Sequence, residues 1–262
     1  MTHWVQKSVE IAKGNGYLDR LHEVYSINTN DIRYIPEQKI EKIKEAHESG
    51  SIPKLIRELL DLEKFPIDDP YVGVFRENES LIEMNPEATD RIGKKLMSYS
   101  IEDLLSMAQA PKMPSRQMGN SFRRWLRTQG YEFIEVGEFQ STNETTLLFL
   151  DGNDTSLKQY VNENLGLTLG DTRKGIDFVF RKGNRFCIGE AKFITTPGGT
   201  QTNQLDVALE VAEINEKARN VYSAAILDGV VWFYGPYLSK IKSRSNLNVM
   251  TSLLFQEFVA SF

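Results

Sequence analysis

The chain of 262 residues carries a formal net charge of −5, and its 40% apolar and 26% charged residues are ordinary for a globular protein of one large or two small domains. No apolar run approaches the roughly 20 residues that span a bilayer, and the first residues lack the order of a signal peptide, so we expect a cytoplasmic protein without a membrane partner. One cysteine, Cys187, excludes an internal disulfide framework, and three histidines that all precede residue 50 argue against a zinc site.

The first 110 residues have mostly helical patterns. Apolar residues recur at helical spacing over 5–25, and Pro53 opens a segment over 54–64 whose apolar residues suffice for a buried face. The run 65–71 contains two prolines that break regular structure and predict a joint between subdomains. We therefore expect a helical N-terminal region over residues 1–110 and a second domain over 111–262.

The next predicted helix covers 115–126, between Pro114 and Gly130. Its apolar stripe, which we expect in the core, is Met118, Phe122, Trp125 and Leu126. The segment between Asp103 and Glu132 has no acid and contains Lys112, Arg116, Arg123, Arg124 and Arg127. Another acid-free segment, 229–256, contains Lys240, Lys242 and Arg244. On an acidic protein such basic surfaces are compatible with DNA binding, and the alternative is an ordinary solvated face.

From Tyr131 onward the apolar pattern becomes that of strands. Short β-branched or aromatic segments predict strands over 133–136, 146–150, 176–180, 186–193 and 223–227, and helices are expected over 156–164 and 203–219. The turn residues Lys182-Gly183-Asn184 predict a β-hairpin over 176–193. This order predicts an α/β fold, with a mixed central β-sheet flanked by helices.

The predicted hairpin brings three charged side chains together. Side chains alternate along a strand, so Glu190 and Lys192 share one face of the second strand, and the turn lets Asp177 of the first strand join them. Charged groups on an apolar strand are costly unless they are paired or hold a metal ion. Alternation alone leaves two interpretations open, a buried salt bridge or a site of two carboxylates and an ammonium.

The spacing of these residues resembles the PD-(D/E)xK nuclease superfamily, and most closely its type II restriction endonucleases. Asp177 is separated by 12 residues from Glu190-Ala191-Lys192, and it follows Gly175-Ile176 where the family pattern often has a proline. The loop 195–204 and the helix after it are also similar to restriction enzymes. The resemblance covers roughly residues 115–230, and it implies a restriction-endonuclease-like core and sequence-specific cleavage of double-stranded DNA.

The resemblance also implies the roles of the site residues. Asp177 and Glu190 would hold Mg²⁺ together with the carbonyl oxygen of Ala191, and hard oxygen ligands suit this ion. Lys192 would orient or deprotonate the attacking water and stabilise charge on the phosphoryl oxygens. Hydrolysis would expel the 3′ oxygen and leave a 5′-phosphate and a 3′-hydroxyl.

A further upstream acid often joins sites of this kind. Glu144 and Asp171 are the candidates in this chain. Asp154, by contrast, is expected to cap the helix that begins near Ser156.

Several side chains near the predicted site are candidates for DNA contact. Reading a sequence requires hydrogen bonds to base edges in addition to phosphate neutralisation. The candidates are Arg116, Gln117, Asn120, Arg123 and Arg124 on the basic helix, and Gln201, Asn203 and Gln204 after the hairpin. Each of them could instead contact phosphate alone, or cap the helix expected from residue 203.

The implied activity also implies partners. One active site per chain and two antiparallel DNA strands imply a homodimer with two-fold symmetry, in which the N-terminal region wraps the DNA or dimerises. A restriction enzyme further implies a cognate DNA methyltransferase as a functional partner in a bacterial or archaeal cytoplasm. Two alternatives remain open, namely a repair or junction-resolving nuclease on the same core, and a non-catalytic DNA-binding module whose carboxylates form only salt bridges.

Overall fold

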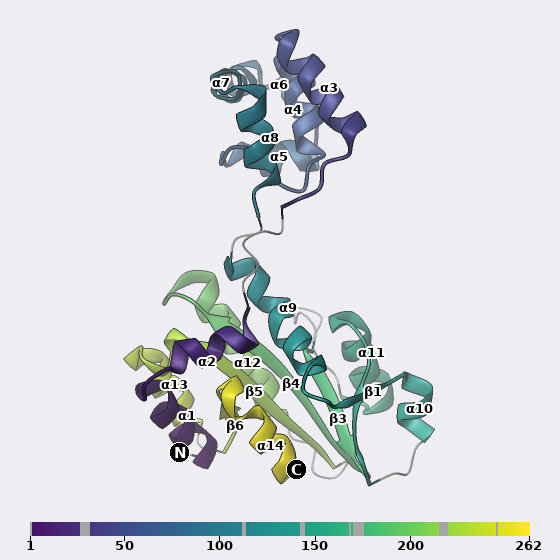
Figure 1. The fold of residues 1–262 in the computed structure, drawn as a ribbon, viewed down its shortest axis with the longest axis vertical. Helices are drawn as coiled ribbons and strands as arrows, with labels where there is room; N and C mark the ends of the chain where they lie inside the picture. Colours follow the sequence, from purple (N-terminus) through teal and green to yellow (C-terminus); the bar gives the residue numbers. More distant parts are fainter. Residues whose placement is uncertain are drawn as a thin grey trace. The chain divides into compact units, whose positions relative to one another are not determined.

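In a computed structural model, the chain forms two compact units, Met1–Ile27 with Pro114–Phe262 and, separately, Asn28–Met113 (Figure 1). The structure describes residues 2–26, 32–111, 114–141, 145–167, 169, 176–214, 220–244 and 246–262, with the backbone alone for 114–120. The division differs from the boundary expected near residue 110, because the first 27 residues belong to the unit that contains the sheet. Within the described ranges, no helix has the length and apolar character needed to cross a membrane.

The first unit is built on a central sheet whose described strands follow the order β1-β2-β3-β4-β5-β6. Strand β3 is antiparallel to both of its neighbours, and the other adjacent pairs are parallel. The strands are β1 Glu132–Ile134, β2 Leu147–Leu150, β3 Phe178–Lys182, β4 Arg185–Ile194, β5 Val221–Gly229 and β6 Asn248–Met250. The predicted fold class, a mixed central sheet flanked by helices, is confirmed, whereas the three-residue β6 is not among the predicted strands.

Strands β3 and β4 form the predicted hairpin. Gly183 lies in its turn with φ 62°, a left-handed conformation that glycine adopts without strain. The register pairs Phe178 with Gly189, and the Asp177 N–H donates to the Gly189 carbonyl oxygen at 2.9 Å. Asp177 is therefore held beside Glu190 by the main chain, at the end of the hairpin opposite the turn.

Helices cover both faces of the sheet (Figure 1). On one face, Leu157 packs with Val179 in a shared buried cluster. On the other face, the Phe178 ring lies 6.1 Å from the Phe122 ring and 5.0 Å from the Phe255 ring, measured between centroids. The helices of this unit are α1 His3–Lys13, α2 Tyr17–Val24, α9 Pro114–Arg127, α10 Val136–Ser141, α11 Asp154–Asn164, α12 Gly199–Glu213, α13 Gly235–Ser243 and α14 Phe255–Ser261, with 3-10 turns at Val230–Trp232 and Ser252–Leu254.

A buried carboxylate explains why the N-terminal helices belong to the sheet unit. Asp228, near the end of β5, is 0% exposed. Tyr17 is the first residue of α2 and Tyr25 directly follows this helix. The Tyr25 hydroxyl donates to Asp228 at 2.9 Å and the Tyr17 hydroxyl at 3.3 Å, and the Ser252 N–H donates at 3.1 Å. Burial raises the pKa of Asp228 above its usual range, although its hydrogen bonds, among them that from Thr251, lower it. Residues from the beginning of the chain and from near its end thus meet at one acid.

The second unit has a core of its own. Its helices are α3 Glu37–Glu48, α4 Ile52–Leu60, α5 Tyr71–Glu77, α6 Leu81–Met84, α7 Pro86–Met97 and α8 Ile101–Gln109. Phe65 and Ile67 are buried in the same cluster as Leu55 and Ile92, from helices on either side of the proline-containing run. The run 65–71 therefore lies inside one compact unit, and the expectation of a joint between subdomains is wrong.

Candidate active site

Asp177, Glu190 and Lys192 lie together at the end of the hairpin. The Lys192 ammonium forms an ion pair with Glu190 Oε1 and lies 3.9 Å from Asp177 Oδ2. The Ala191 N–H donates to the same Asp177 oxygen at 2.8 Å. Strand β4 therefore holds Asp177 through its main chain and also supplies the other carboxylate and the ammonium.

The two carboxylates are buried, at 6% exposure for Asp177 and 2% for Glu190. Glu190 Oε2 is fully buried and has no hydrogen-bond partner within the part of the chain that the structure describes. Burial and the neighbouring Asp177 charge raise the pKa of Glu190 to about 8, an effect that Lys192 only partly offsets. Burial lowers the pKa of Lys192, but the charges of Glu190 and Asp177 outweigh it, so the net shift is upward. Lys192 is therefore an ammonium at neutral pH.

This donor set fits a divalent cation. An unpaired carboxylate oxygen is costly to bury, and a bound cation would compensate it. Carboxylate and carbonyl oxygens are the ligands that Mg²⁺ and Ca²⁺ take in proteins. The site supplies two carboxylate side chains, and among the side chains that the structure describes no group of three or more His, Cys, Asp or Glu could hold a metal ion. The candidates for a further acid, Glu144 and Asp171, lie outside the described residues.

Arg123 of α9 reaches into this site. Its Nε lies 3.3 Å from Asp177 Oδ1, and its Nη2 forms an ion pair with Asp154 Oδ1. The cap of α11 is Asn153, whose side chain accepts the Ser156 N–H at 3.0 Å, so the expectation that Asp154 caps this helix is wrong. Asp154 is instead the first helical residue and a partner of Arg123. The basic helix was predictable, but the sequence contains no signal for this pairing, because it joins three separate segments.

The other DNA-contact candidates on α9 are only partly described. The helix itself spans Pro114–Arg127, as predicted to within a residue at each end. Arg124 is exposed and donates to Ser121 Oγ at 3.2 Å. The side chains that lie outside the described atoms are those of Arg116, Gln117 and Asn120.

The candidates after the hairpin lie on α12. This helix begins at Gly199, so the start predicted at residue 203 is late and Asn203 is inside the helix and not at its cap. Gln201 Oε1 accepts the Thr195 N–H at 3.2 Å and fixes the loop between β4 and α12. Asn203 is exposed and Gln204 is half-buried.

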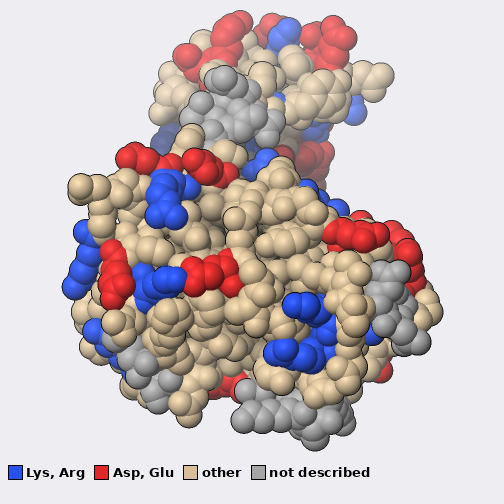
Figure 2. Space-filling model, turned by 60° about the horizontal axis from the view of Figure 1, so that its bottom comes forward, with Lys and Arg blue, Asp and Glu red and all other residues tan. Residues whose placement is uncertain are grey.

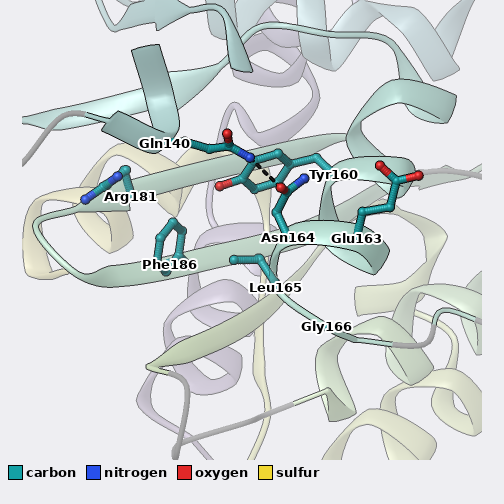
Figure 3. Close-up of a pocket in the computed structure, with 8 residues that line it drawn as sticks. All are labelled: Gln140, Tyr160, Glu163, Asn164, Leu165, Gly166, Arg181 and Phe186. Atoms are coloured by element: carbon teal, nitrogen blue, oxygen red, sulfur yellow. Dashed lines mark hydrogen bonds between the residues drawn. The ribbon is translucent and has the colours of Figure 1, made fainter. Parts of the chain in front are cut away.

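Two cavities lie near the two ends of the hairpin. The cavity that Asp177 and Arg123 help to line has a volume of only about 10 Å³, about the minimum that holds one water molecule. A larger cavity of about 440 Å³ lies beside Gln140, Asn164 and Arg181 (Figure 3). Arg181 is next to the hairpin turn, so this cavity is at the far end of the hairpin from Asp177. The larger cavity is therefore separate from the cluster of Asp177, Glu190 and Lys192.

Surface charge is distributed in small groups. On the face drawn in Figure 2, several basic side chains lie directly beside acidic ones, and the residues coloured there form no continuous basic surface.

Comparison with known proteins identifies the family. The comparisons with curated proteins and with solved structures found no match. A family model described as Tsp45I type II restriction enzyme matches residues 2–262, nearly the whole chain. This match supports a site-specific deoxyribonuclease and gives no support to a junction-resolving nuclease or a non-catalytic module. The chain belongs to the Tsp45I type II restriction enzyme family.

Proposed function

We propose that this restriction enzyme is a Mg²⁺-dependent endonuclease of the PD-(D/E)xK type. It would hydrolyse one phosphodiester bond in each strand of double-stranded DNA at a specific sequence, leaving 5′-phosphate and 3′-hydroxyl ends. The observation that carries the proposal is the buried cluster of Asp177, Glu190 and Lys192 at the end of the β3–β4 hairpin. The buried Glu190 oxygen without a partner among the described residues supports a cation at this cluster.

The residues of the cluster have distinct roles in this proposal. Asp177, Glu190 and the carbonyl oxygen of Ala191 would hold the ion, which supplies Lewis acidity to the phosphate and to a water molecule when bound. The Ala191 N–H keeps the Asp177 carboxylate in place. Lys192 would orient or deprotonate the attacking water, and its ammonium form would stabilise charge on the phosphoryl oxygens.

The proposal includes DNA contacts on two helices. Arg116, Gln117, Asn120, Arg123 and Arg124 of α9 and Gln201, Asn203 and Gln204 of α12 would contact phosphates or base edges. The start of α12 is tied to the site, because the Gln201 side chain accepts a hydrogen bond from the loop that directly follows the strand of Glu190 and Lys192.

Assembly and biological context are also part of the proposal. Two strands and one cluster per chain favour a homodimer, in which the helical unit of residues 28–113 wraps the DNA or dimerises. A cognate methyltransferase would protect the host DNA in the cytoplasm of a bacterium or archaeon.

Digestion of a plasmid of known sequence tests the activity. With Mg²⁺ we expect discrete fragments whose ends sequence to one recurring site, and with EDTA we expect intact plasmid. If DNA ligase joins the fragments without prior enzymatic treatment of their ends, the products carry 5′-phosphate and 3′-hydroxyl groups. Cleavage that persists in EDTA, or fragments with random ends, would contradict the proposal.

A further inference from the structure

We propose that Arg123 is a built-in counter-ion of Asp177 that competes with the metal ion, and that Asp154 weakens this competition. The inference rests on the proposed metal site and assigns to Arg123 and Asp154 the role of positioning residues. It concerns the affinity of the site for a divalent cation before DNA is cleaved.

Both oxygens of Asp177 are engaged in the structure. Oδ2 accepts the Ala191 N–H at 2.8 Å, and Oδ1 faces Arg123 Nε at 3.3 Å. The main-chain contact leaves the carboxylate in place when a cation binds, since an N–H donor and a metal ion can share one carboxylate. The Arg123 contact differs, because it places a full positive charge beside an oxygen that the metal ion would need.

The contact between Arg123 and Asp177 is one that a cation can displace. Arg123 Nε is buried yet makes no hydrogen bond of good geometry within the described part of the chain, so the two groups form an ion pair only. The Arg123 side chain retains 18% exposure and extends to Asp154, whose side chain is 54% exposed at the start of α11. Asp154 therefore offers the guanidinium a second partner on the solvent side of the site.

The charges around the cluster give the direction of the effect. Without a metal ion, Lys192 and Arg123 already place two positive charges beside Glu190 and Asp177. A divalent cation would add two positive charges in the same space, and like charges at short range oppose each other. Loss of the Arg123 charge should therefore strengthen metal binding. Loss of the Asp154 charge should weaken it, because Arg123 would then be attracted by Asp177 alone.

The test measures metal binding in the full-length protein without DNA, so that no turnover occurs. The melting temperature is measured at increasing Ca²⁺ concentrations. The stabilisation by the bound ion gives its affinity even when binding is weak. We expect Arg123→Gln to bind Ca²⁺ about fivefold more tightly than the parent, Asp154→Asn to bind it more weakly, and Arg123→Lys, which keeps the charge, to stay near the parent.

The neighbouring pair of Arg127 and Asp151 provides a matched control. Arg127 lies one turn after Arg123 on α9, and its partner Asp151 directly follows β2. Arg127 also lies over the Phe133 ring. Arg127→Gln should change Ca²⁺ affinity by less than about twofold. A weaker or unchanged affinity in Arg123→Gln, or a tighter one in Asp154→Asn, would overturn the inference. A parent protein without any Ca²⁺ effect, or an Asp177→Asn variant that keeps the effect, would instead overturn the proposed metal site.

Discussion

At the scale of single residues, the site combines groups that the sequence could predict with groups that it could not. Glu190 and Lys192 are two residues apart on one strand, and alternation alone places them on a common face. Asp177 joins them through a short turn, so its position was also predictable. Arg123 and Asp154 come from two helices, and their meeting depends on how α9 and α11 pack on the sheet. Local sequence patterns carry no information about that packing.

Glu190 makes the stability of the metal-free protein depend on pH. Its pKa of about 8 in the folded protein lies above its ordinary value of 4.5, so the unfolded chain loses this proton first. In EDTA, the contribution of Glu190 to the free energy of unfolding is therefore greatest below the ordinary value. It falls as the pH rises from there towards the folded pKa.

Urea unfolding at several pH values in EDTA measures this slope. We expect Glu190→Gln to flatten it, because the amide does not titrate, and we expect added Mg²⁺ to favour the high-pH form because a metal ion binds the carboxylate. An equal slope in Glu190→Gln and the parent would contradict the assignment.

Lys192 provides a second prediction at the same scale. Lys192→Met should lower the single-turnover cleavage rate by about 10²- to 10⁴-fold, since it removes the ammonium that would orient water and stabilise phosphoryl charge. DNA binding in Ca²⁺, measured by gel shift, should remain. Lys7, an exposed partner of Glu257 at the surface, gives the control substitution Lys7→Met. Cleavage by Lys192→Met at the parent rate would remove Lys192 from the mechanism.

At the scale of elements, the β3–β4 hairpin fixes the geometry of the site. Its turn and its apolar strands are local features, and both were predictable. The three-residue β6 was not, because so short a strand has no periodicity to detect and forms only by pairing with β5. The start of α12 at Gly199 was missed for a similar reason, since its first turn is polar and glycine-containing.

Gly189 tests how tightly the hairpin packs beside Glu190. A Cβ atom at this position would lie 2.1 Å from Phe178 Cζ and 2.7 Å from the Ala224 carbonyl oxygen. Because the second neighbour is main chain of β5, Gly189→Ala should lower the free energy of unfolding by roughly 1–3 kcal/mol. Gly137 in α10 has no heavy atom within 4 Å of such a Cβ, so Gly137→Ala should be neutral or stabilising. Urea denaturation of both variants decides, and equal stabilities would contradict the close approach.

At the scale of the whole molecule, sequence and structure divide the chain differently. Helical spacing identified the helices before residue 110, but it could not show that the first of them pack against the sheet. The reason is the buried Asp228, which accepts hydrogen bonds from tyrosine hydroxyls at both ends of α2 and from a main-chain N–H near the C-terminus. A partner more than 200 residues away leaves no trace in a local pattern.

Tyr25→Phe tests this long-range connection. It removes the 2.9 Å hydrogen bond to a carboxylate that is fully buried, which should cost about 1–3 kcal/mol of unfolding free energy. Tyr34 is 85% exposed and lies in the other unit, so Tyr34→Phe should change stability by less than about 0.5 kcal/mol. Equal effects of the two substitutions in urea unfolding would show that Asp228 does not hold the N-terminal helices.

We propose that Asp177 and Glu190 form the metal-dependent catalytic site of this restriction enzyme. The most direct measurement is the single-turnover rate of plasmid cleavage at saturating Mg²⁺ for Asp177→Asn and Glu190→Gln. The control is Asp151→Asn, because Asp151 follows β2 at the end of the sheet where Asp177 precedes β3. We expect both site variants to lose at least about 10³-fold in rate while DNA binding in Ca²⁺ is retained, and the control to remain within about tenfold of the parent. Cleavage by either site variant at a rate near that of the parent would contradict the account.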